Sequence, residues 1–161
     1  MADNNTAETG CCSRLDPSLW DEREFTWQDK PFLRERVISF LHMPLNMGAA
    51  FRRGFAQLER AGAMPVQPFW LSDERSAWGA DLLLEMDGRV EGVEPVRLSG
   101  QFVSKVFSGP YSQIRNWIGE MEKFAAGRNR KIDKLYFHYA YCPKCAKQYG
   151  QNYVVLIARV S

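Results

Sequence analysis

The cysteines are the residues whose spacing most clearly indicates a chemical role in this sequence of 161 residues. Cys142 and Cys145 are separated by two residues, and Cys11 and Cys12 are adjacent near the N-terminus. A two-residue gap lets both thiolates reach one tetrahedral ion, so the four cysteines are candidate ligands of a structural zinc ion, and His138 could replace one of them. A redox pair, or two thiols that order a loop without metal, are the alternatives. We predict no cofactor other than this zinc.

Acidic residues near the middle of the chain are the candidate catalytic groups. Asp81 stands between Ala80 and Leu82 in a strand-like run, and Glu74 lies in the turn before that run. A carboxylate held in an aromatic pocket can act on a water molecule as a general acid or base. The alternative interpretation is a solvated strand edge for Asp81 and an ordinary surface position for Glu74.

Aromatic side chains are abundant, with five Trp, six Tyr and ten Phe. Their rings can stack on a flat ligand or contact a cation through the ring face. A nearby histidine could act as a base, and a lysine could orient an anionic group. The candidate ligand-binding residues are Trp70, Trp78, Tyr111, Tyr139, Tyr141, His138 and Lys105. The alternatives are core packing for the rings, a hydrogen-bonded structural role for the histidine and a solvent-facing strand position for the lysine.

Composition and absent motifs exclude several classes of function. The net charge is only +2, which argues against a nucleic-acid or anionic-membrane partner. No apolar run reaches about 18 residues, so no membrane span is predicted. The N-terminus lacks the basic and apolar regions of a secretory signal, so we expect a cytoplasmic protein. No serine-hydrolase elbow, phosphate-binding loop, zinc-protease helix or Rossmann glycine pattern is present in the sequence.

The predicted strands and helices that position these residues occur in the same order in two successive stretches of the chain. The first stretch has a strand at 36–43, a helix at 47–62 and strands at 69–72 and 78–86. The second has a strand at 102–107, a helix at 112–126 and strands at 135–141 and 152–160. Pro44 and Pro110 stand at equivalent places, about 66 residues apart, and Gly62 and Gly127 end the two helices.

This pattern predicts an α+β fold made of duplicated βαββ units, with an antiparallel sheet and two helices on one of its faces. The other sheet face, or the seam between the copies, would hold a ligand. We expect residues 1–33 to form an N-terminal tail and an irregular arm that packs on the domain. Residues 34–161 would then form a single small-molecule-binding domain.

The motif Phe107-Ser108-Gly109-Pro110-Tyr111, followed by Trp117 and an aromatic strand, resembles the GyrI-like small-molecule-binding superfamily. Residues 40–48, 71–79 and 142–150 are similar to stand-alone bacterial members labelled hydrolases. The resemblance implies the effector-binding-domain fold and an aromatic ligand cleft. Some relatives hydrolyse strained electrophilic rings with a cleft glutamate on the strand equivalent to 135–141. This sequence has no acid on that strand and carries His138 and Tyr139 there instead.

We therefore expect a protein that binds an amphipathic or aromatic small molecule in an aromatic cleft. Hydrolysis of a toxic or xenobiotic compound is the leading hypothesis, in which Asp81 or Glu74 activates water or protonates the leaving atom. A non-enzymatic ligand sensor or sequestering protein is one alternative. A protein-interaction module of the gyrase-inhibitor type is another. A homodimer is compatible with all three hypotheses.

Overall fold

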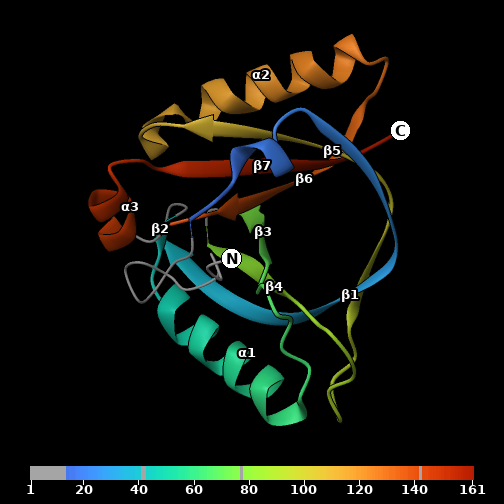
Figure 1. Ribbon diagram of the computed structural model, residues 1–161, viewed down its shortest axis with the longest axis vertical. Helices are drawn as coiled ribbons and strands as arrows, with labels where there is room; N and C mark the ends of the chain where they lie inside the picture. The colour runs from blue at the N-terminus through green and yellow to red at the C-terminus, as the bar shows by residue number, and fades with distance from the viewer. Residues whose placement is uncertain (1–13, 41–42, 77, 142) are drawn as a thin grey trace, which may run out of the picture. The chain divides into compact units, whose positions relative to one another are not determined.

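The computed structural model describes residues 14–40, 43–76, 78–141 and 143–161. In chain order the helices and strands are β1 (Arg23–Phe40), β2 (Met43–Pro44), α1 (Met47–Ala61), β3 (Trp70–Ser76), β4 (Gly79–Glu85), β5 (Val96–Ser108), α2 (Ile114–Gly127), β6 (Ile132–Tyr139), α3 (Pro143–Tyr149) and β7 (Tyr153–Val160) (Figure 1). Short 3₁₀ helices, Pro17–Leu19 and Tyr111–Gln113, precede β1 and α2. Among the residues described, no helix is long and apolar enough to cross a membrane.

The chain divides into two compact units. We call Trp27–Gly100 the α1 unit, because it contains helix α1. We call Gln101–Ser161, together with the N-terminal residues up to Thr26, the α2 unit. The boundaries fall inside strands β1 and β5, so each of these strands contributes residues to both units.

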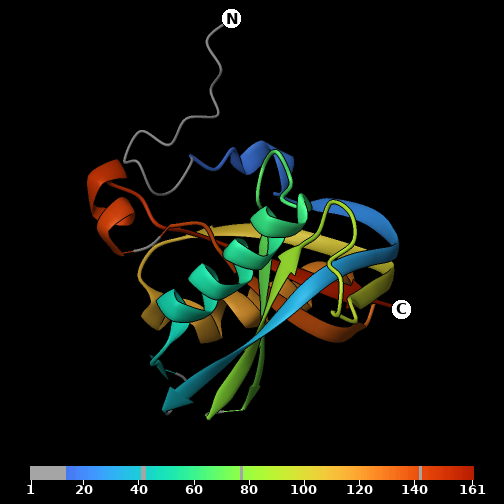
Figure 2. The same ribbon diagram turned by 90° about the horizontal axis from the view of Figure 1, so that it is seen from below.

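In the α1 unit, helix α1 packs along an antiparallel sheet in which β4 lies between β1 and β3 (Figure 2). The helix ends at Gly62, whose φ of 65° places it in the left-handed region that favours glycine. Its buried residues recur at helical spacing as Ala50, Gly54 and Leu58. They meet alternate strand residues in one core: Leu33, Val37, Ala80, Leu82 and Leu84. The other residues of these strands therefore lie on the sheet face opposite α1.

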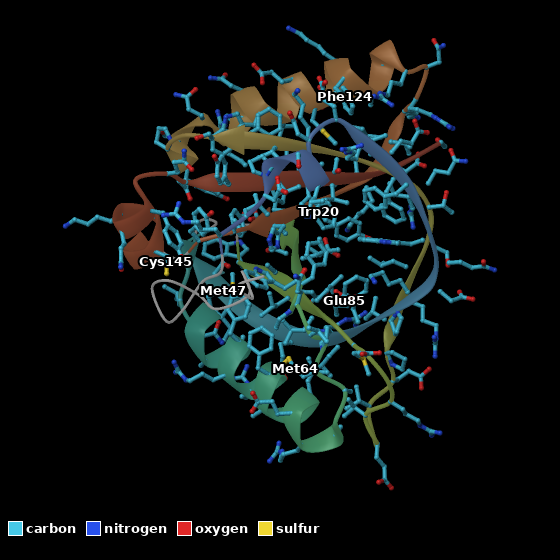
Figure 3. All side chains as sticks on the ribbon, in the orientation of Figure 1. Trp20, Met47, Met64, Glu85, Phe124 and Cys145 are labelled. Carbon is cyan, nitrogen blue, oxygen red and sulfur yellow. The ribbon has the colours of Figure 1, made fainter. Side chains whose placement is uncertain are left out.

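The α2 unit repeats this arrangement with its own elements. Strand β7 pairs antiparallel with both β5 and β6. Helix α2 buries Trp117, Met121 and Ala125 against alternate residues of these strands. A second, smaller cluster surrounds Cys145 on α3 and contains Tyr141 and Leu15. Figure 3 labels Cys145 at this end of the α2 unit.

The prediction of an open sheet with two helices on one face is wrong. Strand β1 has 18 residues and β5 has 13, and they pair with each other in addition to their partners β4 and β7. Neither long strand is therefore the open edge that such a sheet would require. Each unit also covers its own strands with one helix. The fold is dominated by closed strand pairing rather than by a two-layer α+β sandwich.

The stretch expected to be an irregular arm contains the first part of β1, which begins at Arg23. Phe25 and Trp27 alternate there with charged and polar residues, which is the period of a strand. Asp29 has a φ of 49°, which interrupts the regular strand geometry. Pro31 has no N–H to donate to a neighbouring strand, so the sequence around it does not look like a strand. Helix α3 contains Cys145 and lies between the predicted strands 135–141 and 152–160, in an interval for which we predicted no helix.

Candidate functional site

A row of charged residues crosses the sheet of the α1 unit on the face opposite α1. Asp81 on β4 is opposite Arg36 on β1 and opposite Asp73 on β3. We call Arg36, Asp81 and Asp73 the charged row. Directly opposite residues on antiparallel strands have Cβ atoms about 4.5–5.5 Å apart, so their side chains can interact. The row therefore places one cation and two carboxylates side by side.

Asp81 is the most buried member of this row, with only 4 % of its surface exposed. Its neighbours along β4 are apolar, and every residue of the strand between its two ends is buried. A carboxylate is expensive to bury unless other groups compensate its charge. Arg34 of β1 provides part of that compensation, since its Nε lies 3.6 Å from Asp81 Oδ2. The Arg34 side chain is itself 49 % exposed, so the ion pair joins a solvent-facing cation to a buried acid.

Asp73 is a site residue that the sequence analysis did not single out. Its backbone register places it directly across from Asp81, and the Oδ1 atoms of both carboxylates are shielded from solvent. Glu74, which the sequence favoured, is opposite Ala80 instead. Because side chains alternate along a strand, Glu74 points to the other face of the sheet from Asp81. The two predicted catalytic acids are thus not brought together, and the hairpin register is the signal that identifies Asp73.

The two tryptophans predicted to bind ligand occupy different environments in the α1 unit. Trp70 packs against helix α1, with its ring centroid 5.3 Å from that of Phe51 in an edge-to-face contact. Trp78 lies at the β3–β4 turn, where its backbone oxygen accepts a hydrogen bond from Ser39 N–H at 2.9 Å. Its side chain is 61 % exposed. The structure thus assigns Trp70 a packing environment, whereas Trp78 remains available to solvent.

The remaining candidate tyrosines belong to the α2 unit and separate into two places. Tyr111 and Tyr139 share a hydrogen bond between their hydroxyl groups, 2.9 Å apart, and Tyr139 stacks on Phe137. Tyr141 lies instead in the cluster around α3, where Leu15 N–H donates to its hydroxyl oxygen at 2.8 Å. Burial raises the pKa of the Tyr141 phenol, although the hydrogen bond from Leu15 opposes this rise.

His138 and Lys105 have different surroundings in the same unit. His138 is buried on β6, and strand alternation directs it away from the sheet face that carries Tyr139. The Lys105 ammonium is 3.1 Å from a carboxylate oxygen of Glu22. It also lies over the ring of Phe124 on α2, 5.6 Å from the centroid. Lys105 therefore already has a carboxylate partner, and the ligand-binding roles of both residues remain predictions.

The predicted zinc site falls largely outside the described residues, because Cys11, Cys12 and Cys142 are not among them. Cys145 is fully buried, beside Tyr141 and Leu15. Within the described ranges, no group of three or more His, Cys, Asp or Glu residues could hold a metal ion. Zinc binding by the four cysteines stays a prediction, which elemental analysis of the purified protein would test.

Several solved structures share this fold at low sequence identity. A hydrolase from Listeria innocua matches with a TM-score of 0.60 and 17 % identity, over 88 % of this chain and 92 % of that chain. An uncharacterized conserved protein from Listeria innocua matches with a TM-score of 0.59 and 16 % identity, with the same coverage. The EcmrR C-terminal domain matches with a TM-score of 0.58 and 9 % identity, over 89 % of this chain and 98 % of that domain.

At these identities, the similarities establish the fold and leave the activity to other observations. No curated protein matches the sequence. At the level of sequence families, the match to the bacterial hydrolase family extends over residues 2–160, which is almost the whole chain. The chain therefore belongs to the bacterial hydrolase family.

Proposed function

We propose that this protein is a small-molecule hydrolase whose reaction takes place at the charged row, with Asp81 as the catalytic residue. The observation that carries the proposal is a buried carboxylate beside a second carboxylate and two arginines, in a chain of the bacterial hydrolase family. The fold shared with the EcmrR C-terminal domain and the motif around Pro110 support a GyrI-like small-molecule-binding domain. The substrate would be an amphipathic electrophile.

In the proposed reaction, a water molecule lies between Asp81 and Asp73 and donates one O–H to each carboxylate. Two acceptors on opposite strands suit the two donors of a single water and fix its orientation. Asp81 removes a proton as the water oxygen bonds to the electrophilic atom of the substrate. The bond to the leaving atom breaks, the leaving atom keeps the electron pair, and Asp81 then returns the proton to it. Each turnover therefore consumes one water and regenerates the enzyme.

Arg34 acts in this proposal as a positioning residue. Its contact with Asp81 Oδ2 holds that oxygen in place, and Oδ1 of the same carboxylate is the oxygen that accepts the proton in the proposed reaction. The charge of the guanidinium also compensates the burial of the acid. A variant that lacks this charge should therefore impair turnover by displacing Asp81, and Arg34→Lys should restore part of it.

The test compares Asp81→Asn with the wild-type protein on a panel of aryl esters, epoxides and activated cyclopropanes, with addition of one water followed by mass spectrometry. We expect turnover to fall by about 100-fold or more, since a general base contributes at least this factor. Substrate affinity should remain within about twofold, because the amide keeps the shape of the carboxylate. Glu59→Gln, the same chemical change on the exposed surface of α1, is the matched control and should retain full activity.

Two outcomes would overturn the assignment. If Asp81→Asn hydrolyses a substrate as fast as the wild-type protein, Asp81 is not the catalytic residue. If no compound in the panel gains a water while several bind saturably, the protein is a ligand-binding domain rather than a hydrolase. That second outcome corresponds to the sensor or sequestering class.

A further inference from the structure

We infer that Arg36 selects ligands that carry an anionic group, and that the substrate class is therefore an amphipathic anion. The inference rests on the proposed function, because Arg36 is the cationic member of the charged row. It deepens that proposal by naming the chemistry of the ligand: a carboxylate, sulfonate or phosphate joined to an apolar body.

Strand alternation places Arg36 on the reactive face. Leu33 and Val37 of β1 are buried in the core with α1, and Glu35 forms an ion pair with Arg53 of α1, Nε to Oε2 at 3.3 Å. These odd-numbered residues therefore face the helix. Arg34 and Arg36 must then face the other way, toward the side of the sheet that carries Asp81.

The two arginines have different partners. Arg34 is engaged with Asp81, at 3.6 Å. Arg36 is exposed, and within the part of the chain that the structure describes its guanidinium forms no hydrogen bond or ion pair. Its strand position is nevertheless directly opposite Asp81. A guanidinium at this place can bind an anionic group in two-pronged fashion and hold the rest of the ligand near the buried carboxylate.

An apolar surface continues from Arg36 along the same strand. Ile38 is two residues farther on and is 61 % exposed, because the residue opposite it is Gly79, which has no side chain to cover it. Leu45 is also more than half exposed. A backbone hydrogen bond of 2.9 Å, donated by Leu45 N–H to Ile38 O, holds Leu45 beside Ile38 at this end of β1. We call Ile38 and Leu45 the apolar rim.

The arrangement suits a ligand with two chemical parts. The anionic group would bind Arg36, and an aromatic or aliphatic body would cover the apolar rim, where it removes apolar surface from water. A neutral ligand would lose the first interaction, and a small inorganic anion would lose the second. Recognition of both parts together distinguishes this site from a scattered set of surface residues.

The test uses two fluorescent probes that differ in charge. Anilinonaphthalene sulfonate and phenylnaphthylamine share the same ring system, and only the first carries an anionic group. The wild-type protein should bind the sulfonate more tightly. Arg36→Gln should raise the Kd for the sulfonate about fivefold and leave the Kd for the neutral probe nearly unchanged. Arg36→Lys should lie between the two, because it keeps the charge without the planar fork.

Arg52→Gln is the matched control, since it removes the same charge from the exposed side of α1. It should leave both affinities at their wild-type values. The inference is overturned if Arg36→Gln binds the sulfonate as tightly as the wild-type protein, if both probes weaken equally, or if the wild-type protein binds neither probe. Circular dichroism of each variant verifies that the fold is intact.

The outcomes separate this inference from the proposed hydrolase activity. Loss of sulfonate preference in Arg36→Gln, combined with no turnover of any compound, supports an anion-selective binding site and overturns the hydrolase. Turnover that depends on Asp81 but not on Arg36, with equal affinity for both probes, supports the hydrolase and overturns anion selection.

Discussion

At the scale of single residues, the defining feature of the candidate site is the buried carboxylate of Asp81. Asp81 is buried among apolar neighbours on β4, and two of the groups around it, Asp73 and Arg34, come from neighbouring strands. Two carboxylates directly opposite each other on paired strands repel and do not stabilise a sheet. Their presence is more readily explained by a role in binding or chemistry than by a contribution to folding.

The buried phenol of Tyr141 should make the stability of the protein depend on pH in the alkaline range. Burial raises the pKa of Tyr141 above its ordinary value of 10.0, so the folded protein holds this proton more tightly than the unfolded chain does. The associated stability is therefore fully present below about pH 10 and is lost as the pH rises through the higher pKa of the folded state. We expect the free energy of unfolding to fall as the pH rises above about 10.

Urea titrations of the wild-type protein and Tyr141→Phe across this range would measure the effect. The phenylalanine variant should lose this part of the pH dependence. It should also be less stable at neutral pH by about 1 kcal/mol, since Leu15 N–H loses its acceptor. Tyr111→Phe removes a phenol from a different place in the α2 unit, where its hydroxyl group meets that of Tyr139, and serves as the control. A Tyr141→Phe variant with the same alkaline slope as the wild-type protein would contradict the prediction.

At the scale of elements, helix α1 approaches its sheet closely because it carries a glycine at the contact. A Cβ atom added at Gly54 would overlap Leu84 Cδ1 and lie 3.2 Å from Glu35 Cγ. Leu84 is fully buried, so it has little room to move. Helix α2 has a glycine at Gly119 with no heavy atom within 4 Å of such a Cβ. The two helices therefore differ in what a methyl group would meet.

We predict that Gly54→Ala destabilises the protein by about 1–3 kcal/mol, because overpacking outweighs the gain in helix propensity. Gly119→Ala should stabilise it by about 0.5–1 kcal/mol, since only the propensity changes. Thermal melts followed by circular dichroism would measure both changes. The close approach of α1 would be refuted by a Gly54→Ala protein that melts at or above the wild-type temperature.

At the scale of the whole molecule, strands β1 and β5 are shared between the two units. In the α2 unit, the rings of Phe25 on β1 and Phe102 on β5 stack with centroids 5.8 Å apart. In the α1 unit, Asp29 N–H of β1 donates to Ser99 Oγ of β5 at 2.8 Å. The same pair of strands is thus held together on both sides of the unit boundary, and disruption of either part should weaken the other.

This sharing predicts one cooperative unfolding transition. Hydrogen exchange at increasing urea should show the amides of α1 and of α2 losing protection at the same urea concentration. Independent units would instead give two separate midpoints. Loss of protection in α1 at a clearly lower urea concentration than in α2 would show that β1 and β5 do not couple the units.

The sequence alone determined several of the local elements, although not the first part of β1 or helix α3. Helices α1 and α2 lie close to the predicted ranges, because apolar side chains repeat at helical spacing and Gly62 ends the first helix. The strand that contains Asp81 was also predicted, since an acid inside an apolar β-prone run is conspicuous in the sequence itself. These signals are short-range, so neighbouring residues are enough to reveal them.

The tertiary structure decided which distant residues meet. Because β1 pairs with β5, the sheet is not open as predicted. The register of β4 with β1 and β3 brings Asp73, Arg34 and Arg36 near Asp81. A shift of one residue in either pairing would turn these side chains to the other face. Strand β4 is buried on both of its faces, so the alternation of its own residues does not specify that choice. The register depends on how these strands pack with α1 in the core of the α1 unit, which is why the sequence pointed to Glu74 while the folded chain places Asp73 opposite Asp81.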